Sequence, residues 1–121
     1  MLTLSLALAI QAAATPAVVP KDDTLDYDVA CVSVISAAVQ QNEDKAGQLM
    51  PLSTFYIGRI DARSVSDDAI RTAGSAISSD FAGKDIQPVF QSCTETFRTA
   101  GARLNRIASS GADGAPAAGA R

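Results

Sequence analysis

The apolar positions of the chain repeat at helical spacing in four separate stretches. The last stretch is the most regular, because its apolar residues alternate spacings of four and three over residues 86–107. These residues are Ile86, Phe90, Cys93, Phe97, Ala100, Leu104 and Ile107. The pattern predicts a helix with one continuous apolar seam, and Pro88 falls in its first turn, where proline is tolerated. We expect the seam to pack inside the domain rather than between two copies, because a small helical domain needs such a face for its own core.

An earlier stretch predicts a helix over residues 26–41. Its apolar face consists of Tyr27, Cys31, Val34, Ile35 and Ala38. Asp26 and Asp28 lie in the first turn, where the helix dipole favours negative charge. The β-branched residues within 32–35 leave a strand as the alternative.

The second stretch along the chain predicts a helix over residues 51–63. This helix is expected to begin at Pro51, since a first-turn proline loses no hydrogen bond. Its apolar face consists of Leu52, Phe55, Tyr56 and Ile60. Gly58 is a poor helix former, which indicates either a close helix contact or a kink at this position. A strand over residues 55–60 is the alternative.

The remaining pattern predicts a short helix that ends at about residue 79. The residues 64–68 read as a turn and an N-cap, with two acidic residues at the start of the helix. The inward side chains are Ile70, Ala73 and Ile77, and Phe81 packs just beyond them. Gly83 marks the break before the last helix.

The two ends of the chain differ from this helical region. Residues 1–14 (MLTLSLALAIQAAA) combine an apolar run with a small-residue cleavage pattern, which is typical of a secretory signal peptide. Cleavage is expected after Ala14, with Ala17 as the alternative. Residues 15–24 read as an extended lead-in and residues 109–121 as a disordered tail. The sequence therefore predicts one helical domain over residues 25–108 of a periplasmic or secreted protein, without a stable membrane anchor after cleavage.

Composition narrows the possible functions. The chain has ten basic and thirteen acidic residues, a formal net charge of −3, and no histidine or tryptophan. This charge gives no case for binding nucleic acid or an anionic membrane. The only two cysteines, Cys31 and Cys93, lie on the apolar faces of the first and last predicted helices. In an exported protein they predict a disulfide worth about 4 kcal/mol in the chain-entropy account.

Candidate chemistry is sparse. Without histidine, Ser-His-Asp and Cys-His arrangements are impossible, and no phosphate-binding loop, metal-ligand set or cofactor motif is present. We therefore expect a protein that is not an enzyme and carries no metal or cofactor. The acidic residues within 22–28 read as a solvated helix start. Arg59 and Arg63 lie four residues apart; they either bind an acidic partner or pair with Asp61, Asp67 or Asp68.

The order of a signal peptide, a short helical domain, one cysteine in the first helix and one in the last resembles small periplasmic helical proteins of bacteria. The HdeA acid-stress chaperone family shares this arrangement over residues 26–107, as architecture. This chain departs from that family in its longer spacing from Cys31 to Cys93 and in its lack of tryptophan. The stretch over residues 55–63 (FYIGRIDAR) resembles small signal-bearing bacterial proteins without an assigned function. Neither resemblance transfers a functional residue.

These observations lead to two expectations about function. The first is a monomeric, non-enzymatic protein-interaction module of the bacterial cell envelope, with a protein partner that the sequence does not identify. The second is a periplasmic acid-stress chaperone that exposes its apolar core at low pH, since thirteen carboxyl groups lose their charge on acidification.

Overall fold

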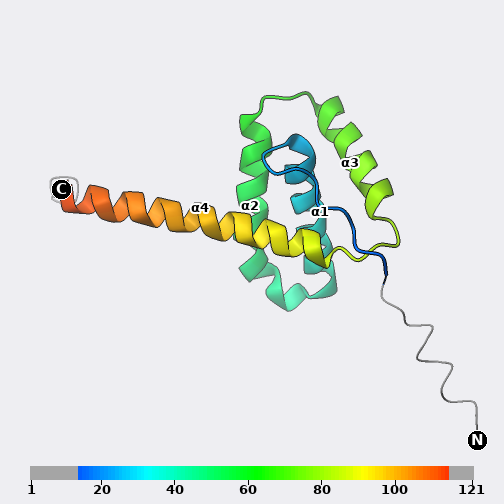
Figure 1. Cartoon of the computed structure of the whole chain (residues 1–121), viewed down its shortest axis with the longest axis horizontal. Helices are drawn as coiled ribbons and strands as arrows, with labels where there is room; N and C mark the ends of the chain where they lie inside the picture. The colour runs from blue at the N-terminus through cyan, green and yellow to red at the C-terminus, as the bar shows by residue number, and fades with distance from the viewer. Residues whose placement is uncertain (1–13, 115–121) are drawn as a thin grey trace, which may run out of the picture.

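The computed structural model describes residues 14–114 and shows an all-α fold (Figure 1). The helices are α1 (Leu25–Gln41), η2 (Glu43–Lys45, a 3-10 helix), α2 (Ala46–Ala62), α3 (Asp67–Phe81) and α4 (Gln87–Gly114). Over these residues no strand forms, and the only β-type contact is an isolated bridge between Pro16 and Asp85. The predicted class, a four-helix domain with one disulfide, is confirmed. The predicted signal segment falls almost wholly on residues 1–13, which lie outside the described part of the chain.

Helix α1 forms the centre of the domain, and α2, α3 and α4 pack around it. Thr24 caps its N-terminus, because the side-chain oxygen accepts a hydrogen bond from the Tyr27 amide at 3.2 Å. The five consecutive residues 27–31 are all buried, which one helical face cannot account for. Helix α1 is therefore enclosed on several sides. The apolar spacing in the sequence predicted only one of its buried faces.

Helix α2 begins at Ala46, five residues before the predicted start, so the prediction that Pro51 opens the helix is wrong. Pro51 lies inside the helix, where it removes one backbone hydrogen bond to the carbonyl of Gly47. Both residues are exposed, so water can satisfy that carbonyl. The close contact or kink expected at Gly58 is also not found. The helix continues through this residue, and an added Cβ would meet nothing within 4 Å.

Helix α3 confirms the predicted start and stop signals. The Ser66 side chain accepts a hydrogen bond from the Ala69 amide at 3.1 Å, as an N-cap residue does. Ala73 and Ile77 are buried against α1. Phe81 is the last residue of the helix, and Gly83 adopts a positive φ of 69° in the turn that follows.

The lead-in crosses the turn before α4. The Ala17 amide donates to the Asp85 carbonyl at 2.8 Å, and the Asp85 amide donates to the Thr15 carbonyl at 2.9 Å. Ala17 is buried. The segment is thus extended, as expected, and it is fixed to the body of the protein from Thr15 onward.

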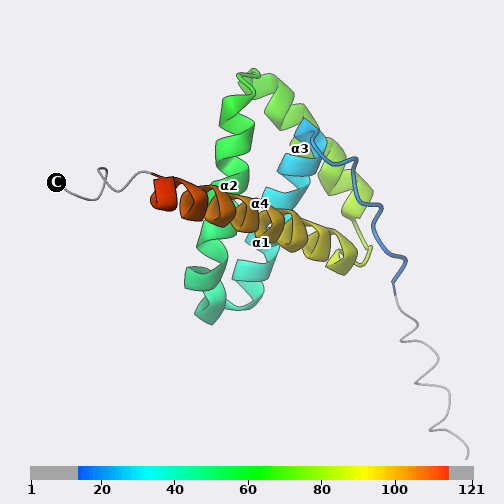
Figure 2. The same ribbon diagram turned by 60° about the vertical axis from the view of Figure 1, so that its left-hand side comes forward.

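Helix α4 crosses α1 and α2 and then runs on beyond the rest of the domain (Figures 1 and 2). It continues through Ser109 and Ser110 to Gly114, so the helix extends past residue 108, the predicted end of the helical domain, into the segment predicted as a disordered tail. The rest of the predicted tail, residues 115–121, lies outside the described part of the chain.

Candidate functional site

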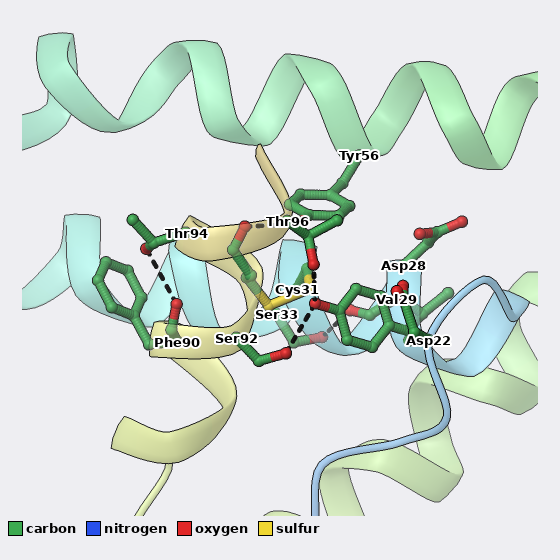
Figure 3. Close-up of a disulfide and its surroundings, with 12 residues drawn as sticks. Asp22, Asp28, Val29, Cys31, Ser33, Tyr56, Phe90, Ser92, Thr94 and Thr96 are labelled. Carbon is green, nitrogen blue, oxygen red and sulfur yellow. Dashed lines mark hydrogen bonds between the residues drawn. A yellow bond between two sulfur atoms is a disulfide. The ribbon is translucent and has the colours of Figure 1, made fainter. Parts of the chain in front are cut away.

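A disulfide attaches α4 to the central helix. Cys31 of α1 and Cys93 of α4 are bonded, with their Cα atoms 5.6 Å apart, and both residues are fully buried (Figure 3). The predicted pairing is confirmed. Because the bond closes a segment of 62 residues, it removes much of the freedom of the unfolded chain.

Two buried tyrosines reinforce this attachment (Figure 3). The Tyr27 hydroxyl forms hydrogen bonds of 2.8 Å with both Ser92 Oγ and Thr96 Oγ1 on α4. The Tyr56 hydroxyl donates to the Cys93 carbonyl at 2.6 Å, and burial raises the pKa of Tyr56 well above its ordinary value. The phenol therefore keeps its proton and donates to the α4 backbone. Together with the disulfide, these contacts join both α1 and α2 to the first half of α4.

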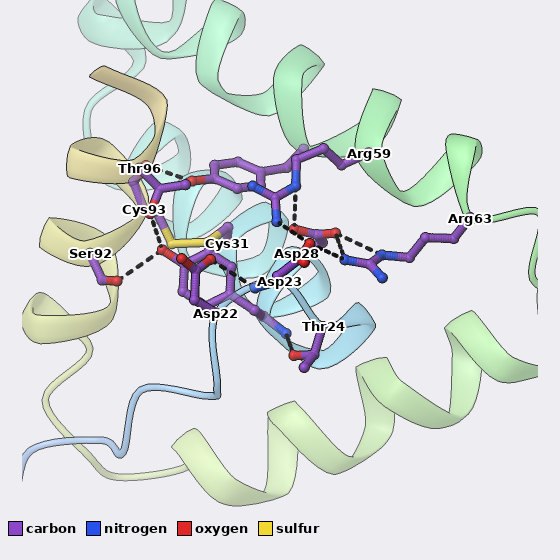
Figure 4. A network of polar contacts seen from close by, with 12 residues as sticks. Asp22, Asp23, Thr24, Asp28, Cys31, Arg59, Arg63, Ser92, Cys93 and Thr96 are labelled. Carbon is purple, nitrogen blue, oxygen red and sulfur yellow. Dashed lines mark hydrogen bonds and ion pairs between the residues drawn. A yellow bond between two sulfur atoms is a disulfide. The ribbon is translucent and has the colours of Figure 1, made fainter. Parts of the chain in front are cut away.

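A buried carboxylate connects α1 to α2 (Figure 4). Asp28 is fully buried, and its Oδ2 accepts from Arg63 Nε at 3.0 Å. Arg59 Nε lies 3.0 Å from the other oxygen, Oδ1, as an ion pair without hydrogen-bond alignment, so Oδ1 has no hydrogen bond to any described residue. Asp23 lies 3.7 Å from both guanidinium groups at the exposed edge of this cluster.

This cluster corrects two expectations about charged residues. The acidic segment 22–28 was expected to be solvated, but Asp28 points into the domain and has no exposed surface. Arg59 and Arg63 pair with Asp28, and at 3.7 Å with Asp23, rather than with Asp61 or the acidic residues in the first turn of α3. The reason is geometric: Arg59 and Arg63 lie one turn apart on α2, and the start of α1 passes both.

The second half of α4 leaves the body. We call residues 98–111 the arm. Leu104 and Ile107, which continue the seam, are 65% and 58% exposed, whereas Val89 and Cys93 in the first half are fully buried. The expectation that the whole seam packs inside the domain is therefore wrong for the arm. The arm passes beyond α2, and no other described element reaches it (Figures 1 and 2).

A groove of about 480 Å³ lies where the arm leaves α2. It is lined by Phe55, Arg59, Thr96, Thr99, Ala100, Arg103, Leu104 and Ile107. The Phe55 ring meets Phe97 edge to face, with centroids 5.4 Å apart, and the Arg59 guanidinium lies 5.6 Å from the Phe55 ring centre. The groove therefore has an apolar floor and a basic rim, and none of its lining residues is acidic. Of the two arginines singled out in the sequence, Arg59 belongs to this groove and Arg63 does not.

The rest of the described region offers less defined chemistry. A larger groove of about 590 Å³ lies between α1, α2 and the start of α4, with amide, lysine and aliphatic side chains mixed along its wall. Within residues 14–114, no three His, Cys, Asp or Glu side chains gather as metal ligands. None of the described helices is both long enough and apolar enough to span a bilayer.

No known protein family matches this chain, and no curated protein or solved structure matches it. Only the residues of this chain therefore bear on the candidate site.

Sequence reasoning found the two cysteines and the seam but missed the buried Asp28 and the tyrosine hydroxyls. A signal for Asp28 was present, since residues 27–31 place one acidic residue among four apolar ones. An acidic residue inside such a run is either solvated at the helix start or paired in the core. Only the position of α2 decides between these alternatives.

Proposed function

We propose that this protein is an exported, non-enzymatic interaction module of the bacterial cell envelope that binds another protein through the arm of α4. The observation that carries this proposal is the exposure of Leu104 and Ile107 on a helix that extends beyond the body. Isolated exposed apolar residues are ordinary, but here two of them continue a regular seam beside an apolar groove.

The firm attachment of α4 supports this use of the arm. The disulfide and the tyrosine hydrogen bonds fix the first half of the helix, so the arm is presented in one direction. A helix that is already formed loses less conformational entropy on binding than a flexible segment does. Burying Leu104 and Ile107 in a partner gains about 1.5–3 kcal/mol for each side chain before those costs.

Export is supported by the cysteines and by the start of the chain. A buried disulfide in a small domain is typical of an oxidising compartment, which in bacteria means the periplasm or the exterior. The backbone contacts of Thr15 and Ala17 favour signal cleavage after Ala14 rather than after Ala17. We expect the intact mass and the N-terminal sequence of the native protein to begin at Thr15. A start at Val18 would contradict this, because cleavage there removes the bridge to Asp85.

The test of the proposed function is the arm-dependent capture of a partner. The tagged protein is cross-linked in its host, purified from the cell envelope and analysed by mass spectrometry. Three forms are compared: the native sequence, the arm variant Leu104→Glu with Ile107→Glu, and the control Asn105→Glu with Ser109→Glu. The control adds the same charge to exposed positions of the same helix outside the seam.

We expect the native protein and the control to capture the same partner in stoichiometric amounts, and the arm variant to lose it. Circular dichroism should show equal helix content in all three, since all four substituted positions are exposed. Equal capture by the arm variant, or no specific partner for any form, would contradict the proposal.

A second candidate is a periplasmic acid-stress chaperone, and the buried Asp28 is the observation that favours it. The contact between α1 and α2 includes the ion pairs of the buried Asp28 with Arg59 and Arg63, and the thirteen carboxyl groups of the chain lose their charge on acidification. We expect such a protein to bind an apolar dye and to suppress aggregation of other proteins at about pH 2–3. Dye binding without suppression of aggregation would exclude this role.

A further inference from the structure

The exposed large apolar side chains of the helices form two separate groups. Apart from valines in the lead-in, those of the described region are Met50 and Ile57 on α2, and Leu104 and Ile107 on the arm. Each group lies on one helix, and both helices carry these residues at helical spacing. The same chain thus presents two apolar surfaces that its own fold leaves uncovered.

The α2 surface is a row of exposed side chains along one side of the helix. Met50 and Ile57 are 66% and 53% exposed and lie two turns apart on the side of α2 that faces away from Tyr56 and the core. Thr54 lies between them and is also exposed. Gly58 follows Ile57 and is exposed, and a Cβ added at Gly58 would meet nothing within 4 Å. We call Met50, Thr54 and Ile57 the α2 row.

The two apolar side chains of the arm are closely spaced, and those of the α2 row are widely spaced. Met50 and Ile57 are seven residues apart, about 10.5 Å along the helix axis, whereas Leu104 and Ile107 are three residues apart, about 4.5 Å. The arm pair can therefore enter the gap over Thr54 between the two larger α2 side chains. On the arm, the small residues Ala100, Gly101, Ala108 and Gly111 flank the pair and permit a close approach of the backbones.

The two surfaces also differ in charge. Arg98, Arg103 and Arg106 are the only charged residues between Thr96 and Gly111, so the arm is basic. The α2 row is followed by the exposed Asp61, and it is preceded in η2 by Glu43 and Asp44 as well as Lys45, all exposed. Of these arginines, Arg103 lies beside Leu104 and Ile107, whereas Arg98 pairs with Glu95. Pairing two arms therefore brings like charges together, whereas pairing an arm with an α2 row brings opposite charges together.

We propose that the arm of one copy binds the α2 row of a second copy, in a head-to-tail contact. The inference rests on the proposed function, that the arm binds protein, and it names the partner as this same chain. The contact cannot form within one molecule, because the α2 row faces away from the core and α4 crosses the opposite side of α2 (Figure 1). Only two or three large side chains on each surface take part, so we expect a weak and concentration-dependent association.

The test measures association by analytical ultracentrifugation over a concentration series up to about 1 mM, so that a contact with a Kd as weak as about 1 mM is still detected. It compares the mature native protein with the arm variant (Leu104→Glu, Ile107→Glu), a row variant (Met50→Glu, Ile57→Glu) and the control (Asn105→Glu, Ser109→Glu). All substituted positions are exposed and lie in helices, so each variant is expected to fold.

The proposal predicts that the native protein and the control associate, and that each of the other two variants weakens association at least tenfold. The decisive step is to mix the arm variant with the row variant. The first keeps an intact α2 row and the second keeps an intact arm, so the mixture regains a one-to-one pair although neither variant associates alone.

Two results would overturn the inference. Association that the row variant keeps and the arm variant loses means that arms pair with arms. A native protein that stays monomeric throughout the series means that no second copy is the partner. In that case, arm-dependent capture of another envelope protein would still support the proposed function, and arm-dependent binding to anionic vesicles would point to a membrane instead.

Discussion

The two halves of α4 carry the same apolar pattern and have opposite surroundings. In the first half, Val89 and Cys93 are fully buried and Phe97 packs on Phe55 of α2. In the arm, Leu104 and Ile107 are more than half exposed. A regular seam therefore shows that a helix has a face to cover, and it does not show which chain covers each part.

The difference has a physical cause in the width of the body. Helix α4 lies across α1 and α2, and its second half extends beyond them (Figure 1). The bonds that fix α4 all fall within residues 92–96, namely the disulfide and the tyrosine contacts. Beyond Phe97 the helix continues on its own hydrogen bonds. Leu104 and Ile107 meet the rest of the protein only at the groove beside Phe55, which leaves them more than half exposed.

The largest expected effect comes from removing the disulfide. Replacing both Cys31 and Cys93 with alanine should lower the free energy of unfolding by about 4 kcal/mol, because the closed segment of the unfolded chain is long. Chemical denaturation under oxidising conditions measures this. A loss of less than about 1 kcal/mol would show that the tyrosine contacts alone hold the first half of α4 on the body.

Asp28→Asn should cost about 3 kcal/mol, since it leaves two guanidinium groups beside the core without their counter-charge. The matched control is Asp68→Asn, which breaks an exposed ion pair with Arg71 and should cost less than about 0.5 kcal/mol. The comparison is made by urea denaturation. Equal effects of the two substitutions would contradict the structural role given to Asp28.

Phe97→Ala and Ile107→Ala test the two halves of the seam directly. Phe97 is partly buried against the core, so its truncation should cost about 2 kcal/mol. Ile107 is exposed, so its truncation in dilute monomer should change stability by less than about 0.5 kcal/mol. Thermal denaturation at low protein concentration measures both. Similar losses would mean that the arm packs on its own domain.

Tyr56→Phe should lower the free energy of unfolding by about 1 kcal/mol, less than Phe97→Ala, because it removes the hydrogen bond from the Tyr56 hydroxyl to the Cys93 carbonyl. The raised pKa of Tyr56 also gives a pH dependence. The unfolded tyrosine releases its proton near pH 10 while the folded one keeps it, so the folded state binds more protons and stability falls as pH rises above about 10. In Tyr56→Phe, the free energy of unfolding should therefore fall less steeply above about pH 10 than in the native protein. An equally steep fall would mean that groups other than Tyr56 cause it.

Some of this structure could be predicted from the sequence, where local signals act alone. The turn and N-cap within residues 64–68, the break at Gly83 and the shared core side of the two cysteines were all correct, because capping and periodicity depend on neighbouring residues. The predicted start of α2 was wrong because proline is common at the start of a helix. Whether Pro51 is tolerated inside a helix depends on whether water reaches the carbonyl of Gly47.

The candidate site depended on features that local signals do not contain. Asp28 reads as a solvated acidic residue until α2 brings Arg59 and Arg63 over it. Leu104 reads as core until the extent of the body is known. Both depend on how far one helix reaches relative to another, and a periodic pattern carries no information on that distance.

Hydrogen–deuterium exchange along α4 tests most directly whether the body covers the first half of the helix and leaves the arm uncovered. The exchange is resolved to single amides and measured at low and high protein concentration. We expect the amides up to Phe97 to be strongly protected at both concentrations. Those of residues 100–108 should exchange rapidly in dilute solution and slow down as the arm finds its partner. Uniform protection along the whole helix in dilute solution would contradict the account, because it would mean that the arm is already covered by its own chain.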